Sequence, residues 1–149
     1  MYNFDYVKAS SVADATAALG GDAQAISGGQ TLIPTLKARL GQPSSLVDLS
    51  GVAEMSGITA GDGSVTIGGA VTHHAVSESG DVPASVAALA AGIGDPAVRH
   101  RGTIGGSVAN NDPSACYPSA CLGLGATIHT SGGDVAADDY FQGMFDTAL

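Results

Sequence analysis

The chain has 149 residues, of which 44% are hydrophobic and 13% are charged, a balance typical of one folded domain with a core and not of a disordered chain. Fourteen acidic residues against five lysines and arginines give a formal net charge of −9, which disfavours nucleic acid and anionic membrane surfaces as partners. No run approaches the roughly 18 apolar residues of a membrane span, and the chain starts without the basic and apolar stretches of a signal peptide, so a cytoplasmic location is expected.

The first 57 residues predict a small α/β unit. Apolar residues at helical spacing follow Ser10 and Ser11, either of which can serve as the N-cap. A later helix carries Pro34 in its first turn, where the missing N–H is tolerated, and stops at Gly41. The expected elements are a helix over 11–19, a strand over 23–27, a helix over 31–40 and a strand over 46–49.

From residue 58 the pattern changes to that of a second unit, which covers residues 58–149. It opens with a hairpin whose turn is Gly61-Asp62-Gly63. Thr72 can cap a helix, and the alanine-rich stretch before Gly92 is typical of a buried helix. The expected elements after the hairpin are helices over 72–77, 82–92 and 115–124, a strand over 126–130 and a short helix over 137–145.

Two segments combine a glycine pair with flanking hydroxyls: the first glycine segment, residues 27–31, and the second glycine segment, residues 103–107. Because glycine has no side chain, successive backbone N–H groups there can approach an anion closely, and the hydroxyls add donors. The first segment also lies between a predicted strand and a predicted helix, a place that favours phosphate. Two such turns suit a pyrophosphate; the alternative is ordinary tight turns, since 22 of the 149 residues are glycine.

The remaining motifs predict neither a catalytic residue nor a metal site. Cys116 and Cys121 fit neither a Cys-x-x-Cys pair nor a disulfide framework, so both are expected to be reduced. The four histidines lack metal-ligand spacing, and the chain has no P-loop and no G-x-S-x-G elbow. Residues 92–97 match a loose G-x-G-x-x-A pattern but follow an expected helix instead of a strand. For Arg99 and Arg101, solvated surface side chains are favoured over contacts with a phosphate or a partner.

The segments 26–34, 46–49, 67–72 and 93–118 together resemble the FAD-binding medium subunit of molybdenum hydroxylases of the carbon monoxide dehydrogenase and xanthine dehydrogenase type. The resemblance runs in order from Tyr2 to Leu149. It implies an α+β fold class, a PCMH-like FAD-binding fold of two α/β subdomains, 1–57 and 58–149, with FAD between them. Similar subunits continue past a segment resembling residues 135–145, so the second subdomain is expected to be truncated.

The resemblance also implies which residues bind FAD. The two glycine segments hold the pyrophosphate, Asn110 makes a further contact, and the apolar side chain of Ile93 faces the isoalloxazine ring. Cys116 stands where the family often has a cofactor-contacting aspartate, so this contact is expected to be weaker or taken over by Asp112. The expected cofactor-binding residues are Ser27, Gly28, Gly29, Gln30, Thr31, Ile93, Thr103, Ile104, Gly105, Gly106, Ser107, Asn110 and Cys116.

The function implied by the resemblance is that of an FAD-dependent oxidoreductase subunit. Its FAD would accept electrons from iron–sulfur clusters and pass them to an external acceptor, while the protein supplies binding and orientation. The implied partners are a molybdenum-cofactor large subunit and an iron–sulfur small subunit. Two alternatives stay open: a truncated binding or assembly module that does not retain FAD, and a different flavoenzyme of the same FAD-binding fold.

Overall fold

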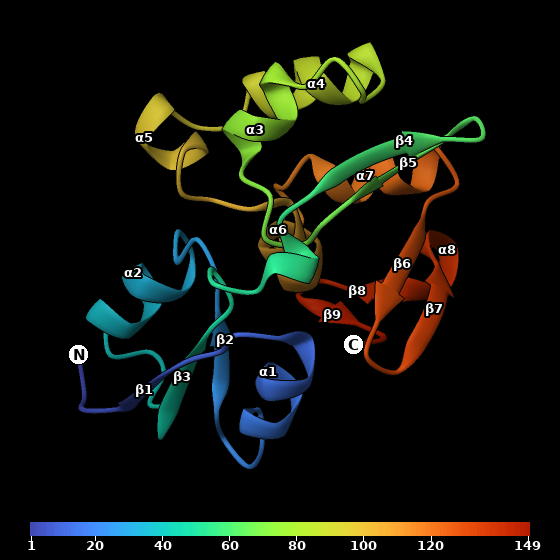
Figure 1. Cartoon of the computed structure of the whole chain (residues 1–149). Helices are drawn as coiled ribbons and strands as arrows, with labels where there is room; N and C mark the ends of the chain where they lie inside the picture. Colours follow the sequence, from blue (N-terminus) through green and yellow to red (C-terminus); the bar gives the residue numbers. More distant parts are fainter.

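The N-terminal part of the chain forms a three-stranded parallel sheet in the computed structural model, which describes all 149 residues. The strands are β1 (Asp5–Lys8), β2 (Gln24–Ile26) and β3 (Ser45–Asp48), in the spatial order β1-β3-β2. The connecting helices are α1 (Val12–Ala18) and α2 (Leu32–Lys37), which lie on either side of the sheet (Figure 1). Because β3 pairs with both other strands, it is the most enclosed, and its Leu46 and Val47 are buried.

Local signals set the ends of these helices. Ser11 caps α1, since its Oγ accepts a hydrogen bond from the backbone N–H of Asp14 at 3.0 Å, as the sequence predicts. Helix α2 is shorter than expected, because Arg39 adopts a left-handed conformation with φ of +59° and interrupts the helix before Gly41. The sequence does not predict β1, whose four residues are all exposed and show no apolar alternation.

The C-terminal part consists of short helices and two-stranded antiparallel sheets. It follows the 3₁₀ turn η1 (Ala53–Met55). Its first half contains β4 (Ile58–Gly61), β5 (Ser64–Ile67), α3 (His73–Glu78), α4 (Ala84–Ala91) and α5 (Pro96–Arg99). Its second half contains α6 (Ile104–Asn110), α7 (Tyr117–Gly123), β6 (Thr127–Thr130), β7 (Gly133–Ala136), α8 (Ala137–Tyr140), β8 (Phe141–Gly143) and β9 (Asp146–Thr147). None of the helices has both the length and the apolar character needed to span a bilayer.

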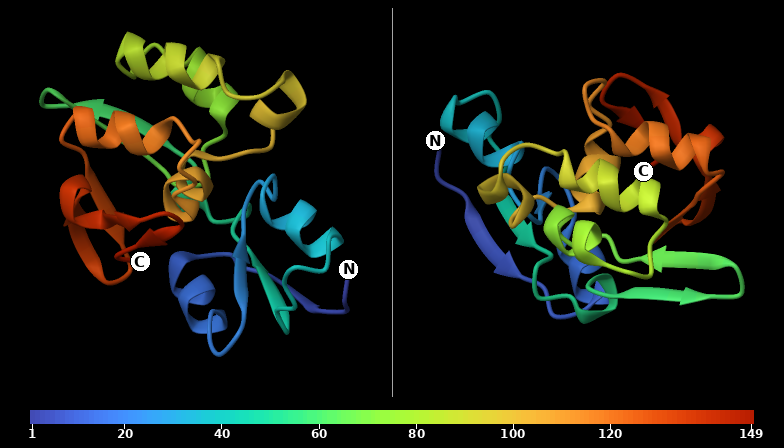
Figure 2. Two further views of the ribbon diagram at one scale, coloured as in Figure 1. Left: turned by 180° about the vertical axis from the view of Figure 1, so that it is seen from behind. Right: turned by 90° about the horizontal axis from the view of Figure 1, so that it is seen from above.

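Two separate hydrophobic clusters stabilise the two parts. The smaller one joins α1 to β3 and consists of Ala9, Ala15, Val47 and Val52. The larger one lies among the helices of the C-terminal part, where α4, α6 and α7 contribute half of its buried side chains. Its buried members are Val71, Val76, Val82, Val86, Ala90, Val108, Tyr117 and Tyr140. Figure 2 shows α6 at the junction, with the parallel sheet and its two helices on one side and helices α3, α4 and α7 on the other.

The structure corrects two of the predicted elements. Residues 103–107, expected as a glycine turn, form the N-cap and the first residues of α6 (Ile104–Asn110), where Thr103 accepts a hydrogen bond from Gly106 N at 3.3 Å. The helix expected over residues 137–145 ends at Tyr140, and the hairpin β8–β9 follows. The residue that stabilises this hairpin is distant in sequence: the side chain amide of Asn111 donates to the carbonyls of Gly143 at 2.7 Å and Asp146 at 3.0 Å.

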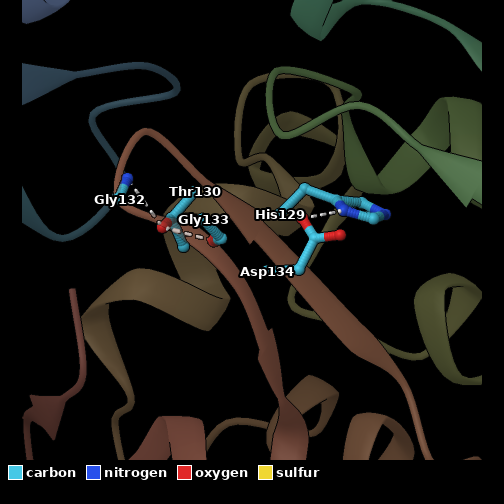
Figure 3. A network of polar contacts seen from close by, with 5 residues as sticks. All are labelled: His129, Thr130, Gly132, Gly133 and Asp134. Carbon is cyan, nitrogen blue, oxygen red and sulfur yellow. Dashed lines mark hydrogen bonds and ion pairs between the residues drawn. The ribbon is translucent and has the colours of Figure 1, made fainter.

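The hairpin β6–β7 gives the glycine pair Gly132-Gly133 a purely local explanation (Figure 3). Thr130 Oγ1 donates to Gly133 O at 2.8 Å and accepts from Gly132 N at 3.1 Å, which closes the turn. One step further out, His129 Nδ1 and Asp134 Oδ1 are 2.6 Å apart across the strands, and both side chains are largely exposed. This glycine pair therefore serves a turn and offers no free donors to a ligand.

Candidate functional site

The first glycine segment presents an unbroken run of free backbone donors. None of the six N–H groups from Ser27 to Leu32 donates a hydrogen bond within the chain, although every one lies in an ordered loop or at the start of α2. Gly29 has φ of +69°, a conformation that favours glycine, and Gln30 Nε2 donates a hydrogen bond to Gly28 O at 3.2 Å. Six adjacent unpaired N–H groups are the kind of donors that bind anions.

The second glycine segment is built differently, and this corrects the expectation of free N–H groups there. Ile104 N donates to Val71 O at 3.0 Å, and Gly105 N donates to Gly69 O at 2.9 Å. Gly106 N is bound to the Thr103 hydroxyl, as described for the cap of α6. What this segment can offer a ligand is therefore the hydroxyl proton of Thr103 and the hydroxyl of Ser107, which makes no hydrogen bond within the chain.

The first glycine segment makes a close backbone contact with the residues directly before the second one. A Cβ atom on Gly28 would lie 2.0 Å from Arg101 O and 2.7 Å from Gly102 Cα, so no side chain fits at residue 28. This contact brings the loop before α2 directly against the residues that lead into α6. The structure therefore brings together the two segments that the sequence analysis paired, although more than 70 residues separate them.

A third glycine pair, Gly68-Gly69, supports this junction from the other side. A Cβ on Gly105 would lie 2.5 Å from Gly69 O, and one on Gly68 would lie 2.2 Å from Met55 O. An isolated antiparallel bridge between Thr72 and Thr103 continues the same contact. Sequence reasoning gave this pair no role at the site; the signal that could have shown it is the glycine pair directly before a predicted helix cap at Thr72.

The other expected site residues lie around this junction in different surroundings. Ile93 is partly buried and packs against the larger hydrophobic cluster, and its carbonyl accepts a hydrogen bond from Arg99 Nη1 at 3.1 Å. Arg99 also donates to Gly94 O at 2.7 Å, so its guanidinium stabilises the loop instead of being free in solvent. The side chain of Asn110 is half-buried and makes no hydrogen bond within the chain.

Cys116 and Asp112 lie beyond α6, in the turn before α7. Cys116 is exposed, and no hydrogen bond joins it to either glycine segment. The Asp112 carboxylate accepts hydrogen bonds from the Ser114 hydroxyl at 2.6 Å and the Ser114 N–H at 2.8 Å, and these bonds lower the pKa of Asp112 below its ordinary value. Asp112 is thus an ionised group with partners of its own.

Two buried titratable groups flank the junction. Burial of Asp48 opposes its ionisation, but hydrogen bonds from Tyr6 and Ser50 outweigh this effect, and the pKa of Asp48 lies below its ordinary value. His73 is 5% exposed, and burial lowers its pKa. Its backbone N–H donates to Gly102 O at 2.9 Å, and its ring lies 5.4 Å from that of Tyr117. His73 is therefore a neutral packing residue beside the second glycine segment.

The chemistry available at the junction is that of binding. Backbone N–H groups and neutral hydroxyls stabilise an anion without changing their own charge, whereas a general acid or base needs a titrating group that reaches the ligand. At Gly106, which is exposed, a Cβ would meet a single atom, Thr103 Oγ1 at 3.0 Å, whereas at Gly28 the backbone of residues 101 and 102 fills the space that a side chain would need.

Comparison with known proteins agrees with this geometry. Residues 2–149 match the family described as "FAD binding domain in molybdopterin dehydrogenase". The carbon monoxide dehydrogenase medium chain of Afipia carboxidovorans is 40% identical over 99% of this chain and 54% of its own length. The nicotine 6-hydroxylase medium subunit of Paenarthrobacter nicotinovorans is 33% identical over 97% of this chain and 54% of its own length. The chain thus spans about half the length of the curated relatives it matches.

Solved structures give the same result. Quinoline 2-oxidoreductase from Pseudomonas putida 86 superposes with a TM-score of 0.93 at 36% identity, over 99% of this chain and 55% of that one. Reconstituted CO dehydrogenase from Oligotropha carboxidovorans gives a TM-score of 0.92 at 39% identity, over 99% and 55% of the two chains. These similarities confirm the α+β FAD-binding fold class expected from the sequence. The chain belongs to the family of FAD-binding domains found in molybdopterin dehydrogenases.

Proposed function

We propose that this chain binds FAD across the junction of its two parts, with the pyrophosphate on the first glycine segment. The observation that carries this proposal is the run of six unpaired N–H groups from Ser27 to Leu32, placed against the second glycine segment by the Gly28 contact. The hydroxyls of Thr103 and Ser107 approach the same anion from the other side. A pyrophosphate is already ionised at neutral pH, so binding it requires hydrogen-bond donors and no proton transfer from the protein. Neutral N–H and hydroxyl groups meet this requirement.

The residues that approach the rest of the cofactor follow from the same placement. Ile93 offers an apolar surface toward the isoalloxazine ring, Asn110 contributes its free amide, and Cys116 provides a weak contact at most because a neutral thiol is a poor hydrogen-bond partner. FAD supplies the redox chemistry when bound. The residues of this chain bind and orient it and exclude water from it. The proposed division into subdomains is 1–57 and 58–149.

In the larger protein the proposed role is electron transfer. The relatives are named as medium chains or subunits of dehydrogenases and hydroxylases, one of them as a subunit of a dehydrogenase complex. By this likeness, the chain takes electrons from an iron–sulfur subunit, which receives them from a molybdenum-cofactor subunit, and delivers them to an external acceptor. The backbone N–H groups and hydroxyls at the junction fit a role in which the cofactor carries the chemistry.

The direct test is retention of FAD by the purified chain. After incubation with FAD and desalting, we expect a yellow protein with quenched flavin fluorescence. A chain that stays colourless at micromolar FAD contradicts the proposal and favours a binding or assembly module without flavin. Flavin that acid treatment fails to release would be covalently attached and would favour a different flavoenzyme of the same fold.

The Gly106→Val variant tests where the pyrophosphate lies. Gly106 is exposed, and the only atom near the position of its missing Cβ is Thr103 Oγ1 at 3.0 Å, which must shift slightly to admit a side chain. The valine side chain would project into the space proposed for the ligand. We expect FAD affinity to fall at least about tenfold, about 1.4 kcal/mol, with little change in helical content by circular dichroism. The matched control is Gly123→Val in α7, another exposed helical glycine with no atom within 4 Å of its Cβ position. Equal affinities of Gly106→Val and the parent chain would disprove this placement.

A further inference from the structure

The proposed pyrophosphate site has many donors but no cation among them. A pyrophosphate diester carries two negative charges, and the chain itself has a net charge of −9. In the nearest part of the sheet, ionised Asp48 pairs in register with Ile26 on one side and with Lys8 on the other, so the charge of Lys8 acts on Asp48. No lysine or arginine occurs between Lys8 and Lys37. Backbone N–H groups alone do not offset this charge, so a positively charged side chain from elsewhere would improve binding.

Arg101 is the cation whose backbone touches the first glycine segment. Its carbonyl oxygen is the atom that a Cβ on Gly28 would meet at 2.0 Å. Its position is fixed, because Arg101 N donates to Val98 O at 3.1 Å and the following residue, Gly102, is buried and bonded to Val98 O at 2.7 Å. The Cα atom of Arg101 is therefore held at the edge of the proposed site, and the long arginine side chain extends from there.

The side chain of Arg101 also has no other partner. It is exposed and makes neither a hydrogen bond nor an ion pair with any residue of the chain. Arg99, only two residues away, differs: its guanidinium is bound to the carbonyls of Ile93 and Gly94. The two arginines around the end of α5 therefore have separate roles, one in holding the loop and one with its donors free.

We propose that Arg101 is a cofactor-binding residue whose guanidinium pairs with the pyrophosphate of FAD held on the first glycine segment. This inference rests on the proposed FAD function and adds a residue to it. The planar guanidinium presents several N–H donors in a fixed fork that matches two phosphate oxygens, and such charge-assisted hydrogen bonds are stronger than those of neutral donors. Arg101 thereby supplies the charge that the glycine segments lack.

The test is a titration of FAD with the parent chain and with the Arg101→Gln and Arg101→Lys variants. Quenching of flavin fluorescence monitors binding, and dissociation constants are measured at low salt and at about 0.5 M salt. We expect Arg101→Gln to weaken FAD binding about ten- to a hundredfold at low salt, and Arg101→Lys to recover part of the loss. The salt dependence of the dissociation constant should decrease in Arg101→Gln, because the screened charge pair is gone. Circular dichroism and the melting temperature without FAD should match those of the parent chain.

The matched control is Lys37→Gln, which changes the net charge by the same amount at the opposite end of α2. It should leave FAD affinity within about twofold of the parent value, since exposed charges at a distance are screened. Equal losses in Lys37→Gln and Arg101→Gln would overturn the inference in favour of a bulk charge effect, and an Arg101→Gln variant that binds FAD as the parent does would overturn it outright. These results presuppose FAD binding by the parent; a parent that binds no FAD would overturn the proposed function and this inference together.

Discussion

At the scale of single residues, the two adjacent glycines of the second segment have different reasons for lacking a side chain. Gly105 faces the backbone of Gly69 so closely that a Cβ would lie 2.5 Å from its oxygen and 2.6 Å from its Cα. Gly106 faces open space apart from one hydroxyl. The two adjacent glycines thus have different roles: Gly105 is required for packing, and Gly106 is open to a ligand.

The close packing at Gly105 predicts that an alanine variant there behaves differently, in the absence of FAD, from an alanine variant at the unpacked Gly123. Gly105→Ala should lower the free energy of unfolding by about 1–3 kcal/mol, because backbone atoms that cannot rotate away must shift. Gly123→Ala in α7, where nothing lies near the Cβ position, should be neutral or slightly stabilising, because alanine is the better helix former. Urea denaturation followed by circular dichroism measures both. A Gly105→Ala variant as stable as the parent would contradict the packing role.

At the scale of elements, α3 and α7 meet through two buried polar rings. Neither His73 Nδ1 nor the Tyr117 hydroxyl has a hydrogen-bond partner within the chain, and both residues are almost fully buried. Burial lowers the pKa of His73 and raises that of Tyr117, so both side chains are neutral at pH 7. The neutral form of His73 is therefore the form that the packing of α3 requires.

A dependence of stability on pH follows from His73. Its pKa is lower in the folded chain than the ordinary value of 6.5, so the unfolded chain binds more protons below that pH, and stability must fall as the pH decreases from about 6.5. His73→Leu removes this titration and should reduce the loss of stability between pH 6.5 and 5. His129→Gln, at an exposed position, should keep it. Denaturant titrations at several pH values measure the difference, and identical pH profiles of His73→Leu and the parent would contradict the assignment.

Elements with local causes could be predicted from the sequence, and elements with distant causes could not. The Ser11 and Thr72 caps act within three residues, and both helices that they begin were expected. Helix α6 contains two glycines, which are poor helix formers, and its first N–H groups depend on the carbonyls of Val71 and Gly69. The hairpin β8–β9 likewise depends on Asn111, about 30 residues away, which no local pattern reveals.

In the candidate site, too, the features with local causes could be predicted from the sequence and those with distant causes could not. The glycine pairs and hydroxyls made both segments visible in the sequence, and the free donors of the first segment agree with that interpretation. The sequence could not show that the N–H of Gly105 is occupied, because its partner Gly69 belongs to a pair that resembled any other glycine turn. It also could not separate Arg99 from Arg101, since only the fold shows which guanidinium is already bound.

At the scale of the whole molecule, the two parts are joined by backbone contacts at glycines. Gly28 lies against Arg101, and Gly68 lies against Met55, whose carbonyl also accepts a hydrogen bond from Ala70 N at 2.8 Å. Contacts of this kind fix the distance between the parts closely, because backbone atoms cannot adapt as flexible side chains can. The cofactor site at the junction depends on that distance.

Gly28→Ala should therefore loosen the junction. The added methyl group would lie 2.0 Å from a carbonyl oxygen, and relieving this overlap should lower the free energy of unfolding by about 1–3 kcal/mol. Limited proteolysis should also become faster between the two parts. Gly20→Ala is the matched control, since no atom lies within 4 Å of its Cβ position. Equal stability of the two variants would show that the contact at Gly28 does not hold the parts together.

The strand order β1-β3-β2 has a consequence for how the chain acquires its structure during synthesis. No hydrogen-bonded strand pair exists in the N-terminal sheet without β3, so β1 and β2 have no partner until residue 48 has left the ribosome. Parallel pairing across such sequence separations carries a loop-closure cost before any contact offsets it, which slows folding. The first glycine segment, which directly follows β2, therefore cannot be fixed at the edge of this sheet until β3 has been synthesised.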